Sequence, residues 1–309
     1  MSDADLAGRT IVVTGASSGF GRGAAIRLGE LGAHVVVAAR RGDALDDVVR
    51  EIEASGGSAL AVPTDVSDPV AVQALADAAV ARFGRIDVWV SNAGVGALGL
   101  FWDIPIEDHV RLIDVNLTGL VLCAHAALTR FREQGEGILV NVGSVDSEVP
   151  LALQTTYAAT KAAVLSLSRS LNEELRLVGA HESIRVGTVM PWAIDTPWWT
   201  AAANYTGHAP RMAAMDDPAI VVDAIVAACT DPREQQPVGP KARVARLSHR
   251  LLPGITERLS ATTIDAEVER ATPVPHTSGA IHHPGAAPAT IDGGIRERMR
   301  REDAAGDDD

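Results

Sequence analysis

A glycine-rich turn near the start of the chain separates a run of β-branched residues from an alanine-rich run. The letters TIVV at residues 10–13 lead into TGASSGFG at residues 14–21. Gly15 permits a tight turn, Gly19 lets backbone approach a pyrophosphate, and Gly21 lets a helix pack closely on the strand. Free N–H groups at the start of that helix favour phosphate. The turn therefore predicts a dinucleotide-binding unit, although glycines at this spacing also serve packing alone.

The same alternation of short Val- and Ile-rich runs with longer alanine-rich runs continues to about residue 230. Connections of this length carry a helix across a sheet, so the strands are expected to be parallel. The sequence predicts an α/β fold, a Rossmann-type doubly wound parallel sheet with helices on both faces. Strands are predicted at 10–14, 34–39, 59–64, 86–91, 137–143 and 184–191, and helices at 19–31, 44–54, 69–83, 108–132, 157–178 and 218–230.

Composition agrees with such a layered sheet. The 309 residues are 47% hydrophobic and 4% aromatic, as expected where small helix residues pack on buried strands. The net charge of −13 argues against nucleic acid as a partner. Cys123 and Cys229 lie in apolar runs and are expected to pack as small hydrophobic residues. The polar N-terminus and the lack of about 18 uninterrupted apolar residues predict a cytoplasmic protein without an integral membrane segment.

The residues at the end of the second predicted strand indicate which of the two nicotinamide dinucleotides the protein prefers. An NAD enzyme needs an acidic side chain there for the ribose 2′-hydroxyl, whereas this chain has Ala39 followed by Arg40 and Arg41. A guanidinium binds a 2′-phosphate through two hydrogen bonds, and a carboxylate would repel it. The pair predicts NADP(H) in preference to NAD(H), although two solvated arginines at a strand end would look the same.

Four polar residues form a candidate catalytic group. Tyr157 and Lys161 are four residues apart at the start of a predicted helix, so both project from one face. A neighbouring ammonium favours the phenolate of a tyrosine, whose ordinary pKa is about 10. Ser144 follows a predicted strand, where its hydroxyl can meet the phenol and a substrate oxygen. Asn116 is a poor helix former within a predicted helix, and it can open the helical hydrogen bonds to hold a water.

These segments, with DV at 65–66 and NAG at 92–94, resemble the short-chain dehydrogenase/reductase family in order and spacing over about residues 6–230. The resemblance implies a sheet of about seven strands and hydride transfer between NADP(H) and a carbonyl or secondary alcohol. It implies that Tyr157 passes the proton, Ser144 polarises the substrate oxygen, Lys161 holds the ribose and Asn116 anchors a water. It assigns the cofactor to Gly15, Ser17, Ser18, Gly19, Phe20, Gly21, Arg40, Arg41, Asp65, Val66, Asn92, Ala93, Gly94, Tyr157, Lys161, Pro191 and Thr196.

The segment after the sixth strand departs from the family pattern. The family usually has Pro-Gly, and this chain has Pro191 and Trp192, so the indole either enters the substrate pocket or shifts the loop. The expected substrate pocket contains Trp192, Trp198, Trp199 and Tyr205. These aromatics predict a bulky apolar substrate, and packing of a lid or a subunit contact explains them equally well. No metal site is expected, because no histidines stand with carboxylate or cysteine at metal spacing.

These patterns divide the chain into three expected parts. Residues 1–235 are expected to form the catalytic domain, with a substrate lid at about 192–215, and 236–271 a C-terminal helical extension. Residues 272–309 are rich in Pro, Gly and charge and are expected to be a disordered acidic tail. The basic stretch within the extension suits a docked surface helix or contact with a membrane surface. The family resemblance implies a homodimer or homotetramer, and a nucleotide-binding scaffold or sensor is the alternative to an enzyme.

Overall fold

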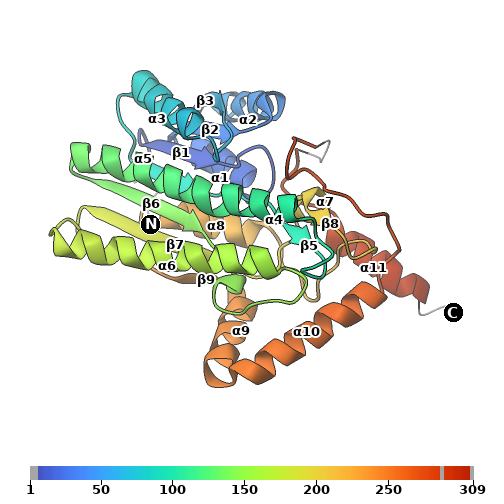
Figure 1. The fold of residues 1–309 in the computed structure, drawn as a ribbon. Helices are drawn as coiled ribbons and strands as arrows, with labels where there is room; N and C mark the ends of the chain where they lie inside the picture. The colour runs from blue at the N-terminus through green and yellow to red at the C-terminus, as the bar shows by residue number, and fades with distance from the viewer. Residues whose placement is uncertain (1–5, 286–288, 307–309) are drawn as a thin grey trace.

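The computed structural model describes residues 6–285 and 289–306, and its centre is a seven-stranded parallel sheet (Figure 1). The strand order is β3-β2-β1-β4-β6-β7-β9, which confirms the predicted doubly wound α/β fold. A separate short pair joins β5 (Ala97–Leu98) to β8 (Ala203–Asn204). The sheet strands are β1 Thr10–Thr14, β2 His34–Ala39, β3 Ser58–Pro63, β4 Val88–Ser91, β6 Gly137–Val142, β7 Ile184–Pro191 and β9 Gln236–Val238.

Helices cover both faces of the sheet, and alternate residues of each strand supply the two cores. In β1, Ile11 and Val13 pack into one cluster, whereas Val12 packs into the other. Because both faces are buried, the central strands are continuous apolar runs in the sequence. One layer contains α1 (Gly19–Glu30), α2 (Gly42–Ala54) and α8 (Ala219–Ala228), and the other contains α3 (Pro69–Phe83), α5 (Gly119–Gln134) and α6 (Thr155–Leu177).

The order of the strands reverses between β1 and β4. From β1 the chain adds β2 and β3 toward one edge, and then returns to place β4, β6, β7 and β9 on the other side. The loops after β1 and β4 therefore diverge and leave a crevice at the carboxyl ends of the strands. The glycine turn follows β1 directly, so the fold brings it to this crevice.

One continuous helical run, Ile106–Gln134, is long and apolar enough by composition to cross a membrane. It comprises α4 (Ile106–Ile113), a π-helical turn at Asp114–Thr118, and α5. Half of its most apolar window is buried within the fold. Phe131 and Cys123 belong to the core that covers one face of the sheet. The buried half of this run thus owes its apolar character to its place in the core.

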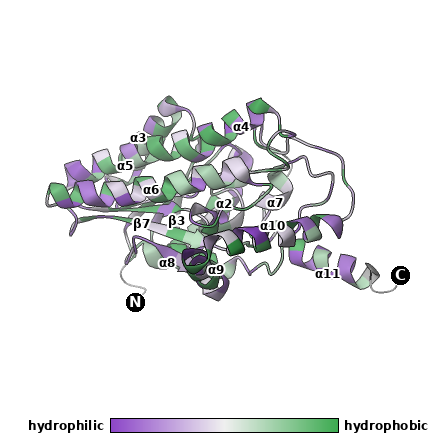
Figure 2. Cartoon of the chain, turned by 60° about the horizontal axis from the view of Figure 1, so that its bottom comes forward, coloured by the Kyte–Doolittle hydropathy of each residue, from purple (hydrophilic) through white to green (hydrophobic). Residues whose placement is uncertain are grey.

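The segment 236–271, expected to be helical, also contains the last strand of the sheet. β9 pairs with β7 before the chain enters α9 (Gly239–Leu251) and α10 (Pro253–Glu269). These two helices extend away from the sheet (Figure 1). Polar and apolar residues alternate along α10 and along the last helix, α11 (Ile295–Gly306) (Figure 2).

The described part of 272–309 corrects the expectation of a disordered tail. α11 (Ile295–Gly306) is helical, and the side chains of Ile281 and Ile295 are buried in the domain. The buried guanidinium of Arg211 forms ion pairs with carboxylates on both α10 and α11. These contacts join residues far apart in the sequence, so local composition could not reveal them. The final residues 307–309 lie outside the described part of the chain.

Candidate functional site

A long cavity lies at the carboxyl ends of the strands, where the predicted site residues converge. One end is walled by the glycine turn and the ends of β2 and β3, and the other by the loop after β6, the start of α6 and the segment after β7. Among the predicted residues, the cavity is lined by Gly15, Ser17, Ser18, Gly19, Phe20, Arg40, Arg41, Asp65, Val66, Asn92, Ala93, Gly94, Ser144, Tyr157, Lys161, Pro191, Trp192, Thr196, Trp198 and Trp199. Gly21, Asn116 and Tyr205 are not part of this lining.

The glycine turn has geometry that side chains would disrupt. Gly15 and Gly19 adopt φ values of +67° and +57°, in the left-handed region that favours glycine. A Cβ on Gly21 would lie 2.4 Å from the carbonyl oxygen of Gly15, and a Cβ on Gly15 would lie 2.8 Å from Cα of Ala93. The close approach of two loops and a helix start forms a cradle of the kind that a pyrophosphate requires.

Polar contacts join this turn to the loop after β4. The Asn92 side-chain amide donates to the carbonyl oxygens of Thr14 and Gly15 at 3.0 and 3.3 Å. In return, Thr14 Oγ1 accepts from the backbone N–H groups of Asn92 and Ala93. The side chain of Thr14, which sequence reasoning did not assign, thus ties together the two strand ends between which the order reverses.

Charged residues gather at the end of the cavity beside β2 and β3. The Arg40 guanidinium donates to backbone carbonyls of residues 280–282, and Arg41 donates to Ser17. Asp65 accepts from Arg111 at 2.6 Å. Burial favours the protonated form of Asp65, but hydrogen bonds from Ser67 and Arg111 hold the pKa of this carboxyl below its ordinary value.

Tyr157, Lys161 and Ser144 lie together at the other end of the cavity. The first two project from the start of α6, and Ser144 follows β6. Lys161 Nζ donates to the carbonyl oxygen of Val142 at 2.8 Å and lies 5.6 Å from the centre of the Tyr157 ring. Burial lowers the pKa of Lys161 to about 8. Burial and the nearby Asp146 raise the pKa of Tyr157 well above its ordinary value, against the effect of a hydrogen bond with Ser144.

Asn116 lies behind this group, in the π-helical turn between α4 and α5. Its side chain accepts from Val95 N–H at 2.8 Å and donates to the Val95 carbonyl at 2.9 Å and to Thr160. The π-helical turn widens the helix where an asparagine was expected to open its hydrogen bonds. Asn116 therefore braces the loop after β4 against α6, and none of its described hydrogen bonds is with Lys161.

Asp146 is a cavity residue that sequence reasoning missed. Its backbone N–H donates to Ser144 Oγ at 3.1 Å, and its side chain is 6% exposed. Burial raises the pKa of Asp146 to about 7, opposed by the charge of Lys161. Its position four residues beyond the end of β6 was a signal, because polar side chains at carboxyl edges point toward the crevice.

Three of the four candidate pocket aromatics reach the cavity. The Trp198 and Tyr157 ring centres are 5.1 Å apart, and Trp199 donates from Nε1 to the Ile194 carbonyl. Trp192 lines the cavity and packs against the hydrophobic cluster that includes α9. Tyr205 corrects the prediction: its hydroxyl donates to Asp108 at 2.5 Å, outside the cavity lining. The β5-β8 pair carries Tyr205 away from the pocket.

Comparisons with a family model, with curated proteins and with solved structures all lead to the same family. A family model for short chain dehydrogenase matches residues 9–205. The oxidoreductase YxnA of Bacillus subtilis is 35% identical over 82% of this chain and 72% of its own length. The 3beta-hydroxysteroid dehydrogenase 1 of Eggerthella lenta is 40% identical over 62% of this chain and 73% of its own. A short chain dehydrogenase/reductase from Burkholderia phymatum, solved with NAD, superposes with a TM-score of 0.73 at 26% identity, covering 83% of this chain and 97% of that one.

Proposed function

This chain belongs to the short chain dehydrogenase family, and we propose that it is a cytoplasmic enzyme that transfers hydride between NADP(H) and a bulky apolar carbonyl or secondary alcohol. The observation that carries the proposal is the grouping of Tyr157, Ser144 and Lys161 in one cavity with the glycine turn. Because the glycine turn supplies a phosphate cradle and the polar trio lies at the opposite end, a dinucleotide lying along the cavity would bring its nicotinamide to the trio.

The polar trio has the groups needed for proton transfer. The bound nicotinamide supplies or accepts the hydride. In reduction, the Tyr157 hydroxyl donates its proton to the carbonyl oxygen, while Ser144 donates a hydrogen bond to that oxygen. The raised pKa of Tyr157 keeps the phenol protonated before the reaction. The Lys161 ammonium then stabilises the phenolate that remains, and in oxidation the same proton returns to Tyr157.

Arg40 and Arg41 support the preference for NADP(H). Both line the cavity at the end away from Tyr157, and no carboxylate occupies position 39. Two guanidinium groups favour a 2′-phosphate over a free hydroxyl through charge-assisted hydrogen bonds. The Burkholderia structure was solved with NAD, so direct competition between the two cofactors is the informative measurement.

Aromatic and aliphatic residues near Tyr157 support an apolar substrate. Trp198, Leu151 and Met212 line the cavity at this end. Flat apolar molecules match such walls, because aromatic rings bury large apolar areas against them. The relative from Eggerthella lenta is named for a hydroxysteroid, which places steroid-sized alcohols first in a substrate panel.

The test combines cofactor titration with turnover. Purified protein is titrated with NADPH and NADH, and oxidation of NADPH is followed with a panel of bulky ketones. We expect tighter NADPH binding that is lost selectively in an Arg40→Ala, Arg41→Ala variant. Tyr157→Phe is expected to lower kcat by about 10²–10⁴-fold while NADPH binding persists. Binding without turnover on any ketone would instead identify a nucleotide-binding scaffold.

The same proposal includes assembly into a homodimer or homotetramer through α5 and α6. Large apolar side chains on the outer surface of the α4–α5 run are exposed, including Val110 at 50%, Ile113 at 42% and Val121 at 45%. Exposed apolar patches on a folded chain commonly mark subunit interfaces. Light scattering coupled to size-exclusion chromatography is expected to show a dimer or tetramer, and a monomeric mass at all concentrations would contradict assembly.

A further inference from the structure

The segment that leads into α11 returns to the cavity from the far end of the chain. We define the C-terminal strap as residues 277–285 and 289–296. We propose that the strap is a specificity-determining part of the cofactor site, because its backbone carbonyls position Arg40 for the 2′-phosphate of NADP(H). This inference rests on the proposed cofactor preference, and it assigns a role to residues outside the matched family segment of 9–205.

Three consecutive strap carbonyls hold the Arg40 guanidinium. Nη1 donates to Ile281 and His282 at 3.1 and 3.2 Å, and Nη2 donates to Ala280 at 2.5 Å. A guanidinium has five N–H donors, so these contacts leave two for a ligand. Arg40 itself remains part of the cavity lining, as do strap residues Ala280 and Gly285. The strap therefore orients Arg40 while the Arg40 side chain still borders the cavity.

The charges around Arg40 favour a dianionic group. Burial and the charges of Arg111 and Arg41 lower the pKa of Arg40, and Asp65 opposes them. The strap carbonyls hold Arg40 by hydrogen bonds but carry no formal negative charge, so the strap does not neutralise the positive charge of Arg40. A 2′-phosphate would neutralise it, whereas a ribose hydroxyl would not.

The strap is anchored on both sides of its contact with Arg40. On one side, Arg111 Nε donates to the Ile281 carbonyl at 3.1 Å, and His282 Nε2 lies 2.7 Å from Asp108 Oδ1. The Ile281 side chain is fully buried. These contacts fix the backbone whose carbonyls meet Arg40, and a fixed acceptor lowers the entropy lost when the arginine is ordered.

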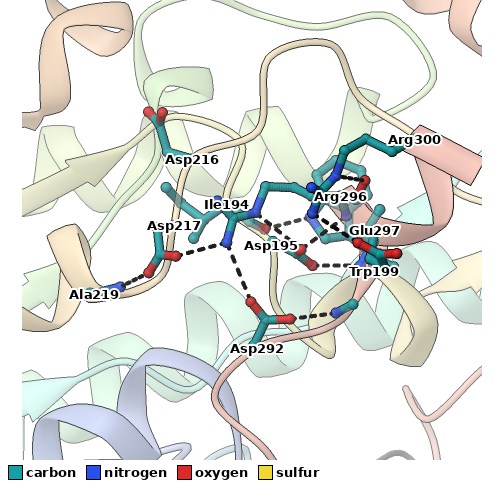
Figure 3. A network of polar contacts seen from close by, with 12 residues as sticks. Ile194, Asp195, Trp199, Asp216, Asp217, Ala219, Asp292, Arg296, Glu297 and Arg300 are labelled. Atoms are coloured by element: carbon teal, nitrogen blue, oxygen red, sulfur yellow. Dashed lines mark hydrogen bonds and ion pairs between the residues drawn. The ribbon is translucent and has the colours of Figure 1, made fainter.

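The second anchor lies beside the other end of the cavity. The buried carboxylate of Asp195 accepts from the backbone N–H of Ile295 at 2.8 Å and of Arg296 at 2.9 Å. Figure 3 shows Arg296 reaching from the strap toward Asp195, Asp217 and Asp292. Between the anchors, Gly19 N–H donates to the Thr290 carbonyl at 2.8 Å. The described parts of the strap thus contact the site at Arg40, at Gly19 and at Asp195, which precedes Thr196.

A double-mutant cycle tests whether the strap positions Arg40. Four proteins are compared: the full chain, a chain ending at His276, Arg40→Ala in the full chain, and Arg40→Ala in the shortened chain. Calorimetry measures Kd for adenosine 2′,5′-bisphosphate, which carries the 2′-phosphate, and for NADH, which lacks it. In the full chain, Arg40→Ala is expected to weaken the bisphosphate by about 10–100-fold. In the shortened chain, the same substitution is expected to cost less than about 3-fold, because Arg40 is no longer oriented.

A point variant keeps the test valid if the shortened chain folds poorly. His282→Ala removes the contact with Asp108 and is expected to weaken the bisphosphate about 3–10-fold with NADH affinity unchanged. His283→Ala, at the exposed neighbouring position, is the matched control and is expected to change neither affinity.

The outcomes distinguish a failure of the proposed role of the strap from a failure of the proposed cofactor preference. If strap removal tightens bisphosphate binding and enlarges the effect of Arg40→Ala, the strap competes with phosphate and the inference is overturned. Full bisphosphate affinity in both the shortened chain and His282→Ala would also overturn it. If Arg40→Ala in the full chain leaves the bisphosphate unaffected, the proposed NADP(H) preference itself fails, and the role of the strap fails with it.

Discussion

At the scale of single residues, Asp146 changes the electrostatics of the proposed catalytic group. Burial and the Asp146 carboxylate both raise the pKa of Tyr157, whereas burial lowers the pKa of Lys161 against the opposing effect of the same carboxylate. The pKa of Asp146 itself is raised to about 7, so the carboxyl changes charge near neutrality. The proton equilibrium of the phenol is therefore linked to that of a carboxyl nearby.

Asp146→Asn is expected to shift the pH dependence of alcohol oxidation toward lower pH. Removing the negative charge favours the phenolate, so the pKa of Tyr157 falls and the base form is reached at a lower pH. The measurement is kcat/KM against pH for both proteins. Asp103→Asn, a change in a turn outside the cavity lining, is the control. An unshifted profile would show that Asp146 does not influence the reacting phenol.

The glycine turn offers a second test at this scale. Gly21→Ala is expected to lower the free energy of unfolding by about 1–3 kcal/mol and to weaken binding of both dinucleotides, because overpacking forces the backbone to move. The new Cβ would lie 2.4 Å from the Gly15 carbonyl oxygen. Gly254→Ala, where a Cβ meets nothing within 4 Å, is the control, measured alongside by urea unfolding. Equal stability of both variants would refute the steric argument.

At the scale of elements, a buried arginine attaches the last two helices to the domain. The Arg211 side chain is 1% exposed and pairs with Glu267 on α10 and with Glu302 and Asp303 on α11. These carboxylates raise the pKa of Arg211 against the effect of burial. Since the strap ends within the first turn of α11, the same ion pairs help to hold the strap in place.

Arg211→Met is expected to destabilise this attachment by about 1–3 kcal/mol, because the buried Glu267 carboxylate loses its hydrogen bond from Arg211 and keeps only the longer contact with Arg270 at 3.5 Å. Hydrogen exchange should then accelerate in α10 and α11, while β1 and β4 at the sheet centre remain protected. Arg300→Met removes an exposed pair with Glu297 and is expected to change stability by less than about 1 kcal/mol. Unchanged exchange in α11 after Arg211→Met would show that other contacts hold the helix.

At the scale of the whole molecule, the cavity is lined by parts of the chain that lie far apart in sequence. Arg40 on one side and the carbonyl of Ile281 on the other are separated by 241 positions. Cofactor contacts in such a site are expected to stabilise the sheet, the strap and α11 together. Cofactor binding is therefore expected to raise the free energy of unfolding of the whole chain.

NADPH at about 100 times its Kd is expected to raise the free energy of unfolding by about 2.7 kcal/mol. This corresponds to a rise in Tm of several degrees, measured by calorimetry. At the same concentrations, Arg40→Ala should show a smaller rise with NADPH and an unchanged rise with NADH. A larger rise with NADH than with NADPH in the unaltered chain would contradict the proposed cofactor preference.

Local sequence determined the repeating unit of this protein. The strand–turn–helix order around TGASSGFG, the parallel α/β fold and the four-residue spacing of Tyr157 and Lys161 follow from short-range periodicity and backbone freedom. The sequence alone also showed that Trp192 replaces the usual glycine, because the residues around it match the family pattern.

Only the tertiary structure decided where the distant segments lie. Composition predicted disorder for the tail, yet buried Ile281 and the ion pairs of Arg211 fix much of it. Tyr205 was assigned to the pocket by its proximity in sequence to the tryptophans, and β8 turns it toward Asp108. The physical reason is common to both cases: periodicity describes neighbours a few residues apart, whereas burial and ion pairing depend on which surfaces the completed sheet brings together.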